Sequence, residues 1–579
     1  MTSMGSSWLN DATAARASPY ILPPVGSERR ESGTSGAAVL VEHLRDHLGA
    51  RVVFGIPGVH NMAIFDALSR SGVRTVLVRH EQSAVYAADG YARATGRIGV
   101  AVTTTGPGAA NAAAAMGEAR AARSPVLHVS TQVDSRILDG RSGRFSLHES
   151  PSQRELMAAV SVWSAGVARP DAIASMVVKA GREAMSARRG PVFLEIPHDF
   201  LSVSVRAPAA PRGGARPIEA DARSLTRAAA LLADAKRPVL WVGGGAVSAD
   251  ATAAVRSVAE ALGAPVVTTF NGKGILDRDH PLLVGYPPHQ PEVTALVERA
   301  DAVVVVGSDL DAMNTQGWRV RLPRPRIGIN VVPEDARRNY ACDVVVEADA
   351  RSALEALLPL LEPRSGAAAE RRVATVRERA EERLRSTREF AGPLRFVRRL
   401  EKLVPRDTVV FADMAVAGYW LAGYFRPSAP RRFASAGWGT LGFALPAAIG
   451  AAASGARALA VCGDAGALFA IGELATAVQE ELPLAVLVVS DAGYGMLRFD
   501  ARERYGAPVA TDLRAPDFVA LAESFGVPAR RATQRDAAAA LEWATAHRGP
   551  ALVELRARFA PPLTTSPRWP LKARPEARP

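Results

Sequence analysis

The chain has 579 residues, of which 48% are hydrophobic and 22% are charged, and its formal net charge is +12. This length predicts about three to four domains, while the absence of a long apolar stretch and of a secretory signal predicts a cytoplasmic protein without membrane insertion. Its basic residues are scattered rather than clustered with aromatic residues, so we do not expect nucleic-acid binding.

The first structured region is predicted at residues 37–205. Residues 1–36 are rich in Ser, Gly, Ala, Arg and Pro without periodicity, which predicts a disordered tail. Short apolar runs then alternate with Ala-rich helical stretches, at 52–57, 75–80, 99–106, 125–131 and 191–197. This alternation predicts a parallel sheet with helices on both faces.

A second region, residues 219–362, follows a linker rich in Pro, Gly and Arg at 206–218. It has the same alternation, with apolar runs at 238–245, 265–270, 302–309, 326–332 and 344–349. A charged, helix-prone connector at 363–392 comes next. We expect a second α/β domain.

The third region, residues 393–560, precedes a Pro- and Arg-rich tail at 561–579. Its apolar runs lie at 408–413, 458–466, 484–493 and 550–557. The first and third regions both close with a strand that is led by Gly-Pro and carries an acid, which indicates two related domains flanking another. The predicted fold class is therefore α/β, with three doubly wound parallel-sheet domains.

Two acids follow strands of the third region. One strand leads into Gly463-Asp464-Ala465-Gly466, and the other leads into Asp491-Ala492-Gly493. Both acids are expected at the carboxyl ends of parallel strands, where ligands of such sheets bind. Small residues let backbone N–H groups approach an anion, and a hard cation prefers carboxylate and carbonyl oxygens. A Mg²⁺-diphosphate site is favoured over the alternative of ordinary strand-end turns.

The sequence between Asp464 and Asp491 resembles the metal-diphosphate motif of thiamine-diphosphate (ThDP) enzymes of the acetolactate synthase and decarboxylase type. That motif begins with Gly-Asp-Gly and ends with Asn-Asn, so Ala465 and the pair Ser490-Asp491 depart from it. The resemblance implies Mg²⁺ ligands at Asp464, Asp491 and the backbone of Gly493. It further implies cofactor contacts from Gly463, Ala465, Gly466, Tyr494, Gly495 and Met496.

Four segments of the first region resemble the pyrimidine-binding domain of this family: 54–58, 79–84, 87–93 and 105–111. The resemblance implies that Glu81 is catalytic and contacts the aminopyrimidine, with cofactor-binding positions at Pro57, Gly58, Gly106 and Asn111. A carboxyl group hydrogen-bonded to the ring nitrogen promotes the imino tautomer, which can remove a proton from the thiazolium. The alternative is a Glu on a solvated surface.

The segment 435–451 is similar to the part of the family that grips the pyrimidine and bends the cofactor. By this resemblance the carbonyl of Gly439 accepts from the 4′-amino group, Thr440 contacts the cofactor and Leu441 is the apolar wedge. His148 lies where family members place residues near the reacting carbons, so it is a candidate proton relay or else a surface histidine. The segment 413–417 lacks the Gln-His-Gln of the synthases.

The central region is similar to the flavin-carrying domain of acetolactate synthases at residues 243–245 and 271–274, but it departs from the flavin-contact pattern at 307–318. FAD is therefore an open alternative. The resemblance also implies active sites shared between the subunits of a homodimer or homotetramer, with a small 2-keto acid as substrate.

The predicted activity is decarboxylation of a 2-keto acid with Mg²⁺ and ThDP, followed by acyl transfer to a second carbonyl compound. One alternative is simple decarboxylation that releases an aldehyde, and another is a non-catalytic partner protein with the same fold.

Overall fold

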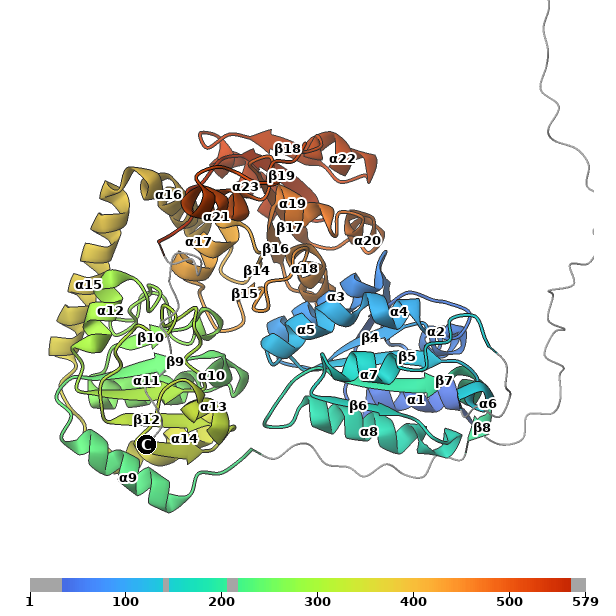
Figure 1. Ribbon diagram of the computed structural model, residues 1–579, viewed down its shortest axis with the longest axis horizontal. Coiled ribbons are helices and arrows are strands. Elements are labelled where there is room, and N and C mark those ends of the chain that lie inside the picture. Colours follow the sequence, from blue (N-terminus) through green and yellow to red (C-terminus); the bar gives the residue numbers. More distant parts are fainter. Residues whose placement is uncertain (1–33, 139–144, 206–216, 564–579) are drawn as a thin grey trace, which may run out of the picture.

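The computed structural model describes residues 34–138, 145–205 and 217–563. Residues 1–33 and 564–579 of the predicted tails and 206–216 of the predicted linker lie outside this range. The described chain forms three α/β units, each built on its own parallel sheet, which confirms the predicted fold class (Figure 1). None of the described helices has the length and apolar character needed to cross a membrane.

The N-terminal sheet has the strand order β3-β2-β4-β5-β7-β6, and every pair in it is parallel. Its strands are β2 (Val52–Gly55), β3 (Arg74–Leu77), β4 (Gly99–Thr103), β5 (Val126–Gln132), β6 (Trp163–Gly166) and β7 (Val192–Pro197). The main helices are α1 (Gly36–Asp46), α2 (Met62–Ser69), α3 (Glu81–Thr95), α5 (Ala113–Ala121) and α8 (Ile173–Ala184).

This unit starts earlier than the sequence predicted. A short strand β1 (Thr34–Ser35) pairs in antiparallel fashion with β8 (Ser204–Val205), and the Ser35 side chain caps α1. Residues 34–36 therefore belong to the domain and not to the predicted tail, because these contacts hold them against the last strand of the N-terminal domain.

The central sheet has the order β10-β9-β11-β12-β13 and is also parallel. Its strands are β9 (Pro238–Val242), β10 (Val266–Thr268), β11 (Ala302–Val306), β12 (Arg326–Asn330) and β13 (Val344–Glu347). Every residue of β9 and β11 is buried, as expected for central strands with helices on both faces. These helices are α9 (Ala222–Ala233), α11 (Thr252–Leu262), α12 (Pro291–Glu298) and α14 (Ala350–Leu357).

The C-terminal sheet has the order β15-β14-β16-β17-β19-β18. Numbered along each domain, this is the same order as in the N-terminal sheet, and the two Gly-Pro-led segments form the equivalent strands β7 and β19. The strands are β14 (Val409–Ala412), β15 (Phe433–Ser435), β16 (Ala458–Gly463), β17 (Leu484–Ser490), β18 (Ala529–Ala532) and β19 (Ala551–Arg556). The predicted relation between the outer domains therefore extends to their topology.

The helices of the C-terminal domain cover both faces of this sheet (Figure 1). They are α17 (Val416–Tyr424), α18 (Ala444–Ala453), α19 (Asp464–Leu468), α20 (Glu473–Gln479), α21 (Gly495–Tyr505), α22 (Phe518–Ser524) and α23 (Ala537–Ala546). Two of them, α19 and α21, begin directly at the carboxyl edge where the predicted metal ligands lie.

The outer domains meet through helices α3 and α18. Two glycines make this close approach possible: a Cβ atom at Gly90 would lie 2.0 Å from the backbone oxygen of Ala447, and one at Gly450 would lie 1.8 Å from that of Ala87. Backbone therefore packs directly on backbone, and the contact fixes the N-terminal domain against the C-terminal one.

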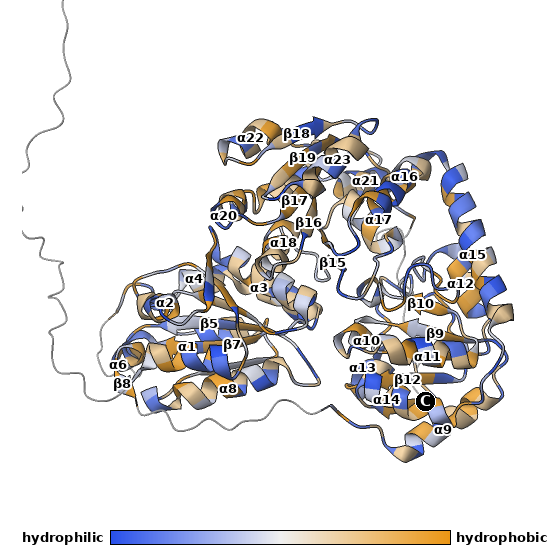
Figure 2. Ribbon diagram, turned by 180° about the vertical axis from the view of Figure 1, so that it is seen from behind, coloured by the Kyte–Doolittle hydropathy of each residue, from blue (hydrophilic) through white to orange (hydrophobic). Residues whose placement is uncertain are grey.

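The connector consists of two helices, α15 (Ala367–Ser386) and α16 (Arg388–Leu403). The second helix ends at Leu403, so the connector extends past the predicted boundary at residue 392. Pro393 lies inside α16 and does not end it. Much of α15 is hydrophilic, and the helix runs along the outer side of the molecule (Figure 2).

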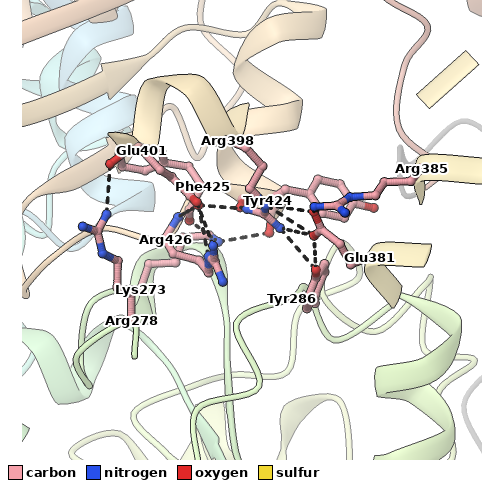
Figure 3. A network of polar contacts seen from close by, with 11 residues as sticks. Lys273, Arg278, Tyr286, Glu381, Arg385, Arg398, Glu401, Tyr424, Phe425 and Arg426 are labelled. Carbon is pink, nitrogen blue, oxygen red and sulfur yellow. Dashed lines mark hydrogen bonds and ion pairs between the residues drawn. The ribbon is translucent and has the colours of Figure 1, made fainter. Parts of the chain in front are cut away.

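A polar network ties the connector to both neighbouring domains (Figure 3). Glu381 of α15 pairs with Arg398 of α16, and Arg398 pairs in turn with Glu401. Glu401 also binds Arg426 just beyond α17. From the central domain, Lys273 donates to the carbonyl oxygens of residues 423 and 425, where α17 ends. The network thus fixes the end of a helix whose other end lines the candidate site.

Candidate active site

The predicted metal ligands lie at the carboxyl ends of two adjacent strands. Asp464 is the first residue of α19, and Asp491 directly follows β17, which pairs with β16. The Oδ2 atom of Asp464 accepts hydrogen bonds from the backbone N–H groups of Asp491, Ala492 and Gly493 at 3.2, 2.6 and 3.2 Å. The chain fold therefore brings Asp464 and the 491–493 turn together.

Asp491 carries a second carboxyl group into this edge. Burial, reinforced by the nearby Asp464, raises the pKa of Asp491 to about 6. The opposing charge comes chiefly from Arg498, which is 6% exposed and whose Nη1 atom lies 3.4 Å from Asp491 Oδ2. Arg498 also donates to the carbonyl of Ala492 at 2.8 Å. This arginine was missed by sequence reasoning, because a single Arg in a charged helix carries no distinguishing signal.

A cavity of about 240 Å³ opens at this edge. Of the predicted positions, its lining includes Gly439, Leu441, Gly463, Asp464, Ala465, Gly466, Asp491, Gly493, Tyr494, Gly495 and Met496. Residues 414–417 line it as well, so the segment in which the Gln-His-Gln of the synthases is missing lies at this cavity. Thr440 is outside the lining, because its hydroxyl donates to Glu118 instead.

Backbone geometry shapes this cavity. Gly439 adopts a φ of +96°, which L side chains rarely adopt. A Cβ atom at Gly466 would lie 2.6 Å from a carboxyl oxygen of Asp413. Burial raises the pKa of Asp413 to about 6, and its Oδ2 atom accepts from the backbone N–H of Gly442 at 3.0 Å. Glycine is thus required at 439 by the backbone conformation and at 466 by the close approach of Asp413.

The other predicted positions gather at the carboxyl edge of the N-terminal sheet. Glu81 begins α3, and its Oε2 atom accepts from Asn111 Nδ2 at 3.0 Å. Gly106, with a φ of +65°, is the N-cap of the short helix α4 (Pro107–Asn111) that carries Asn111. Pro57 and Gly58 follow β2, where Gly58 N–H donates to Asn61. These residues therefore form one group, centred on the Glu81 carboxylate and separate from the cavity above.

His148 belongs to a cluster of histidines in this group. Its ring centroid is 5.6 Å from that of His60, which stacks on His198 at 4.7 Å. His60 also shares a 2.8 Å hydrogen bond with Thr105, and burial together with the two neighbouring imidazoles lowers its pKa. His60 and His198 were missed from the sequence, because they are distant in the chain and each looks unremarkable alone.

The two groups are not joined within one chain. Among the described residues, the lining of the 240 Å³ cavity comes from the C-terminal domain, and neither Glu81 nor His148 contributes to it. Both groups are flanked by exposed apolar side chains: Val59 and Leu147 are 87% and 76% exposed beside the first, and Phe469 and Leu497 are 57% and 55% exposed beside the second.

A larger cavity of about 700 Å³ lies between the central domain and both outer domains. Residues 243–245 and Asn271 of the flavin-like motifs line it, together with Arg123 and Arg189 of the N-terminal domain. Lys273 of the second motif is not part of the lining, because it is buried against the end of α17. Burial lowers the pKa of Lys273 to about 7.

Three family models for thiamine pyrophosphate enzymes match this chain in succession. The N-terminal TPP-binding domain matches residues 34–156, the central domain matches 225–357 and the C-terminal TPP-binding domain matches 413–555. The three matches follow the order of the three sheets.

Curated relatives match along nearly the whole chain. A probable 2-ketoarginine decarboxylase of Pseudomonas aeruginosa is 35% identical over 92% of this chain and 95% of its own length. The acetolactate synthase large subunit of Parasynechococcus marenigrum is 34% identical over 90% and 88%, and that of Corynebacterium glutamicum is 32% identical over 91% and 87%.

Proposed function

The chain belongs to the thiamine pyrophosphate enzymes, and from this premise we propose that it decarboxylates a 2-keto acid and transfers the acyl group to a second carbonyl compound. The observation that carries the proposal is that Asp464 and Asp491, which directly follow two adjacent strands, line one cavity. When bound there, thiamine diphosphate supplies a carbon nucleophile and an electron sink next to the keto group.

A divalent cation such as Mg²⁺ fits the oxygen atoms at this edge. Two carboxylates and the backbone carbonyl of Gly493 would hold it, and hard cations prefer such ligands. Backbone N–H groups at the beginning of α19 favour an adjacent diphosphate. The charge of Asp491 is partly balanced by Arg498, so the extra carboxylate is compatible with an anionic cofactor.

The pyrimidine ring of the cofactor would be held between the two groups of residues. Leu441 supplies an apolar surface in the cavity, and Gly439 lines it as well, so its carbonyl would accept from an amino group. Glu81, held by Asn111, would exchange a proton with a ring nitrogen. The His60–His148–His198 cluster lies in the same group and offers imidazole nitrogens for proton transfer to substrate.

We infer that Glu81 reaches the cavity from a second copy of the chain. Within the described residues it does not reach the cavity, and exposed apolar side chains surround both groups. We therefore propose a homodimer, or a homotetramer built from such dimers, in which each N-terminal group completes the cavity of the partner.

Any FAD would bind in the 700 Å³ cavity, whose lining includes the glycines at 243–245 and the basic residues Arg123 and Arg189. The visible absorption spectrum of the purified protein tests this assignment. Flavin bands are expected if FAD is bound, and a colourless active protein would remove FAD from the proposal.

Simple decarboxylation to an aldehyde is the second candidate. It is favoured by the relative named a probable 2-ketoarginine decarboxylase, which matches 92% of this chain, as much as the synthases do. It is also favoured by residues 414–417, which line the cavity without the Gln-His-Gln that the resemblance to the synthases leads us to expect.

A panel of 2-keto acids, beginning with pyruvate, distinguishes these functions. The protein is incubated with ThDP, Mg²⁺ and each acid, and CO₂ is assayed together with the carbon products, with Asp464→Ala as the inactive control. Release of CO₂ with a carbon–carbon coupled product is the expected result. An aldehyde as the sole organic product would establish the second candidate, and no CO₂ from any acid would refute both.

A further inference from the structure

The segment 435–443, which carries Gly439 and Leu441, is held largely by the N-terminal domain of its own chain. Arg93 of α3 donates to the carbonyl of Ser435 at 2.9 Å and stacks over the ring of Phe443 at 4.7 Å. Gly117 of α5 lies so close to Trp438 that a Cβ atom would be 2.2 Å from its indole ring. Contacts from another domain thus flank the turn on both sides.

The centre of these contacts is Glu118, a fully buried residue of α5. Its Oε1 atom accepts from the backbone N–H of Gly437 at 2.7 Å, and its Oε2 atom accepts from that of Trp438 at 2.9 Å and from the Thr440 hydroxyl at 3.3 Å. Three donors that lie on either side of Gly439 therefore converge on one carboxylate from a different domain.

Arg93 provides the positive charge that makes this buried carboxylate tolerable. Its Nη2 atom bonds Glu118 at 3.0 Å and Asp89 at 2.7 Å. Burial alone would lower the pKa of Arg93, but the two carboxylates outweigh it and raise that pKa, so the guanidinium remains charged. A buried acid with this many charge-assisted hydrogen bonds holds its partners firmly.

We infer that Glu118 is a positioning residue for the cofactor: by fixing residues 437, 438 and 440 it sets the direction of the Gly439 carbonyl and the place of the Leu441 side chain. This inference rests on the proposed function, because it presumes that ThDP occupies the cavity lined by these two residues. Glu118 itself is outside that cavity and does not touch the reacting atoms.

Among the described residues, Glu118 is the carboxylate that accepts hydrogen bonds from donors on both sides of Gly439. Gly439 has a φ of +96°, and a Cβ atom there would meet nothing within 4 Å, so packing around this residue does not restrict the turn. On the side of its own domain, Gly442 is held by Asp413. Hydrogen bonds before and after Gly439 therefore determine its orientation, and Glu118 accepts those from Gly437, Trp438 and Thr440.

The first test compares Glu118→Gln with Glu480→Gln in the full-length protein without added cofactor. The control removes the charge from another contact across the same domain interface, the 2.9 Å ion pair between Glu480 and Arg74. Neither of these residues belongs to the turn. Backbone hydrogen exchange of residues 435–443 is followed by mass spectrometry. Gln presents an NH₂ group to one of the backbone donors, so exchange there should become about tenfold faster or more, while the control leaves it unchanged.

A second variant covers the case in which Glu118→Gln fails to fold. Thr440→Val removes one donor to Glu118 without changing buried charge, and it should accelerate exchange in the same segment by a smaller factor. In the ThDP-loaded protein, both variants should slow exchange of the cofactor C2 proton, by about tenfold or more for Glu118→Gln, because small misplacements of reacting groups are costly.

Unchanged hydrogen exchange in the segment for both variants, or a normal C2 exchange rate in a Glu118→Gln protein whose segment is loosened, would overturn the inference. Failure of the premise that ThDP occupies the cavity gives a different result, since the unsubstituted protein would then not bind ThDP while the variants would still alter hydrogen exchange of the turn.

Discussion

Replacing Glu81 by Gln should leave the fold and cofactor binding almost intact while removing most of the turnover. The oxygen of Gln can still accept the hydrogen bond that Asn111 Nδ2 donates at 3.0 Å, and the side chains are nearly equal in size. The proposed anchor for the diphosphate and the cation lies in another domain, at Asp464, Asp491 and Gly493. The change therefore removes only the ability to share a proton with the pyrimidine ring.

The size of the effect follows from that single loss. General acid–base assistance contributes about 10²–10⁴-fold to a rate, which corresponds to about 3–5 kcal/mol in the barrier. A neutral amide cannot replace it, whereas the weak ring contact that Gln retains should change the ThDP dissociation constant by less than about tenfold.

The assay is exchange of the C2 proton of bound ThDP for deuterium, measured by NMR after acid quench. Asp66→Asn is a suitable control, because Asp66 forms an exposed ion pair with Arg70 in the same domain. A Glu81→Gln protein that exchanges the C2 proton at a near-normal rate would show that Glu81 only begins a helix and that the active site is elsewhere.

Three further outcomes are expected. Asp491→Asn should retain activity but shift the preference among divalent cations, because the amide oxygen still coordinates without the charge; a folded but wholly inactive variant would contradict this. Gly90→Ala should lower the free energy of unfolding by at least about 1–3 kcal/mol, since its Cβ would lie 2.0 Å from the Ala447 oxygen; an unchanged denaturation midpoint would refute this packing. Burial lowers the pKa of His128 to about 3, so the unfolded chain binds its proton first and stability should fall below about pH 6.5, by about 2 kcal/mol at pH 5; an equal pH dependence in a folded His128→Gln variant would exclude His128 as the source.

The strands that the sequence predicts are those with continuous apolar runs, such as β11 and β17, which are buried on both faces. The strands that it misses are short ones at or near sheet edges. β18 reads Ala-Arg-Arg-Ala and β15 is three residues long, so neither has a run that alternates or stays apolar. Their positions are set by pairing with the neighbouring strand, which a local pattern does not contain.

The candidate site divides in a similar way. Asp464 and Asp491 can be placed together from sequence, because a strand–helix–strand unit brings successive strand ends to one edge. The side chains that support the site come from other elements: Arg498 from α21, His198 from beyond β7, and Glu118 across a domain boundary. The cofactor contact of Thr440 stays a prediction, and the bond from its hydroxyl to Glu118 could not be predicted, since only the fold determines which way a side chain in a tight turn points.

The most direct test of the account is calorimetric titration of ThDP into the protein with and without Mg²⁺, for the unsubstituted chain and for Asp464→Ala. Because Asp464 holds the 491–493 turn and would coordinate the cation, we expect cation-dependent ThDP binding in the former and no measurable binding of either in the variant. Equal ThDP affinity in the two proteins, with Asp464→Ala folded, would contradict the assignment of this edge as the cofactor site.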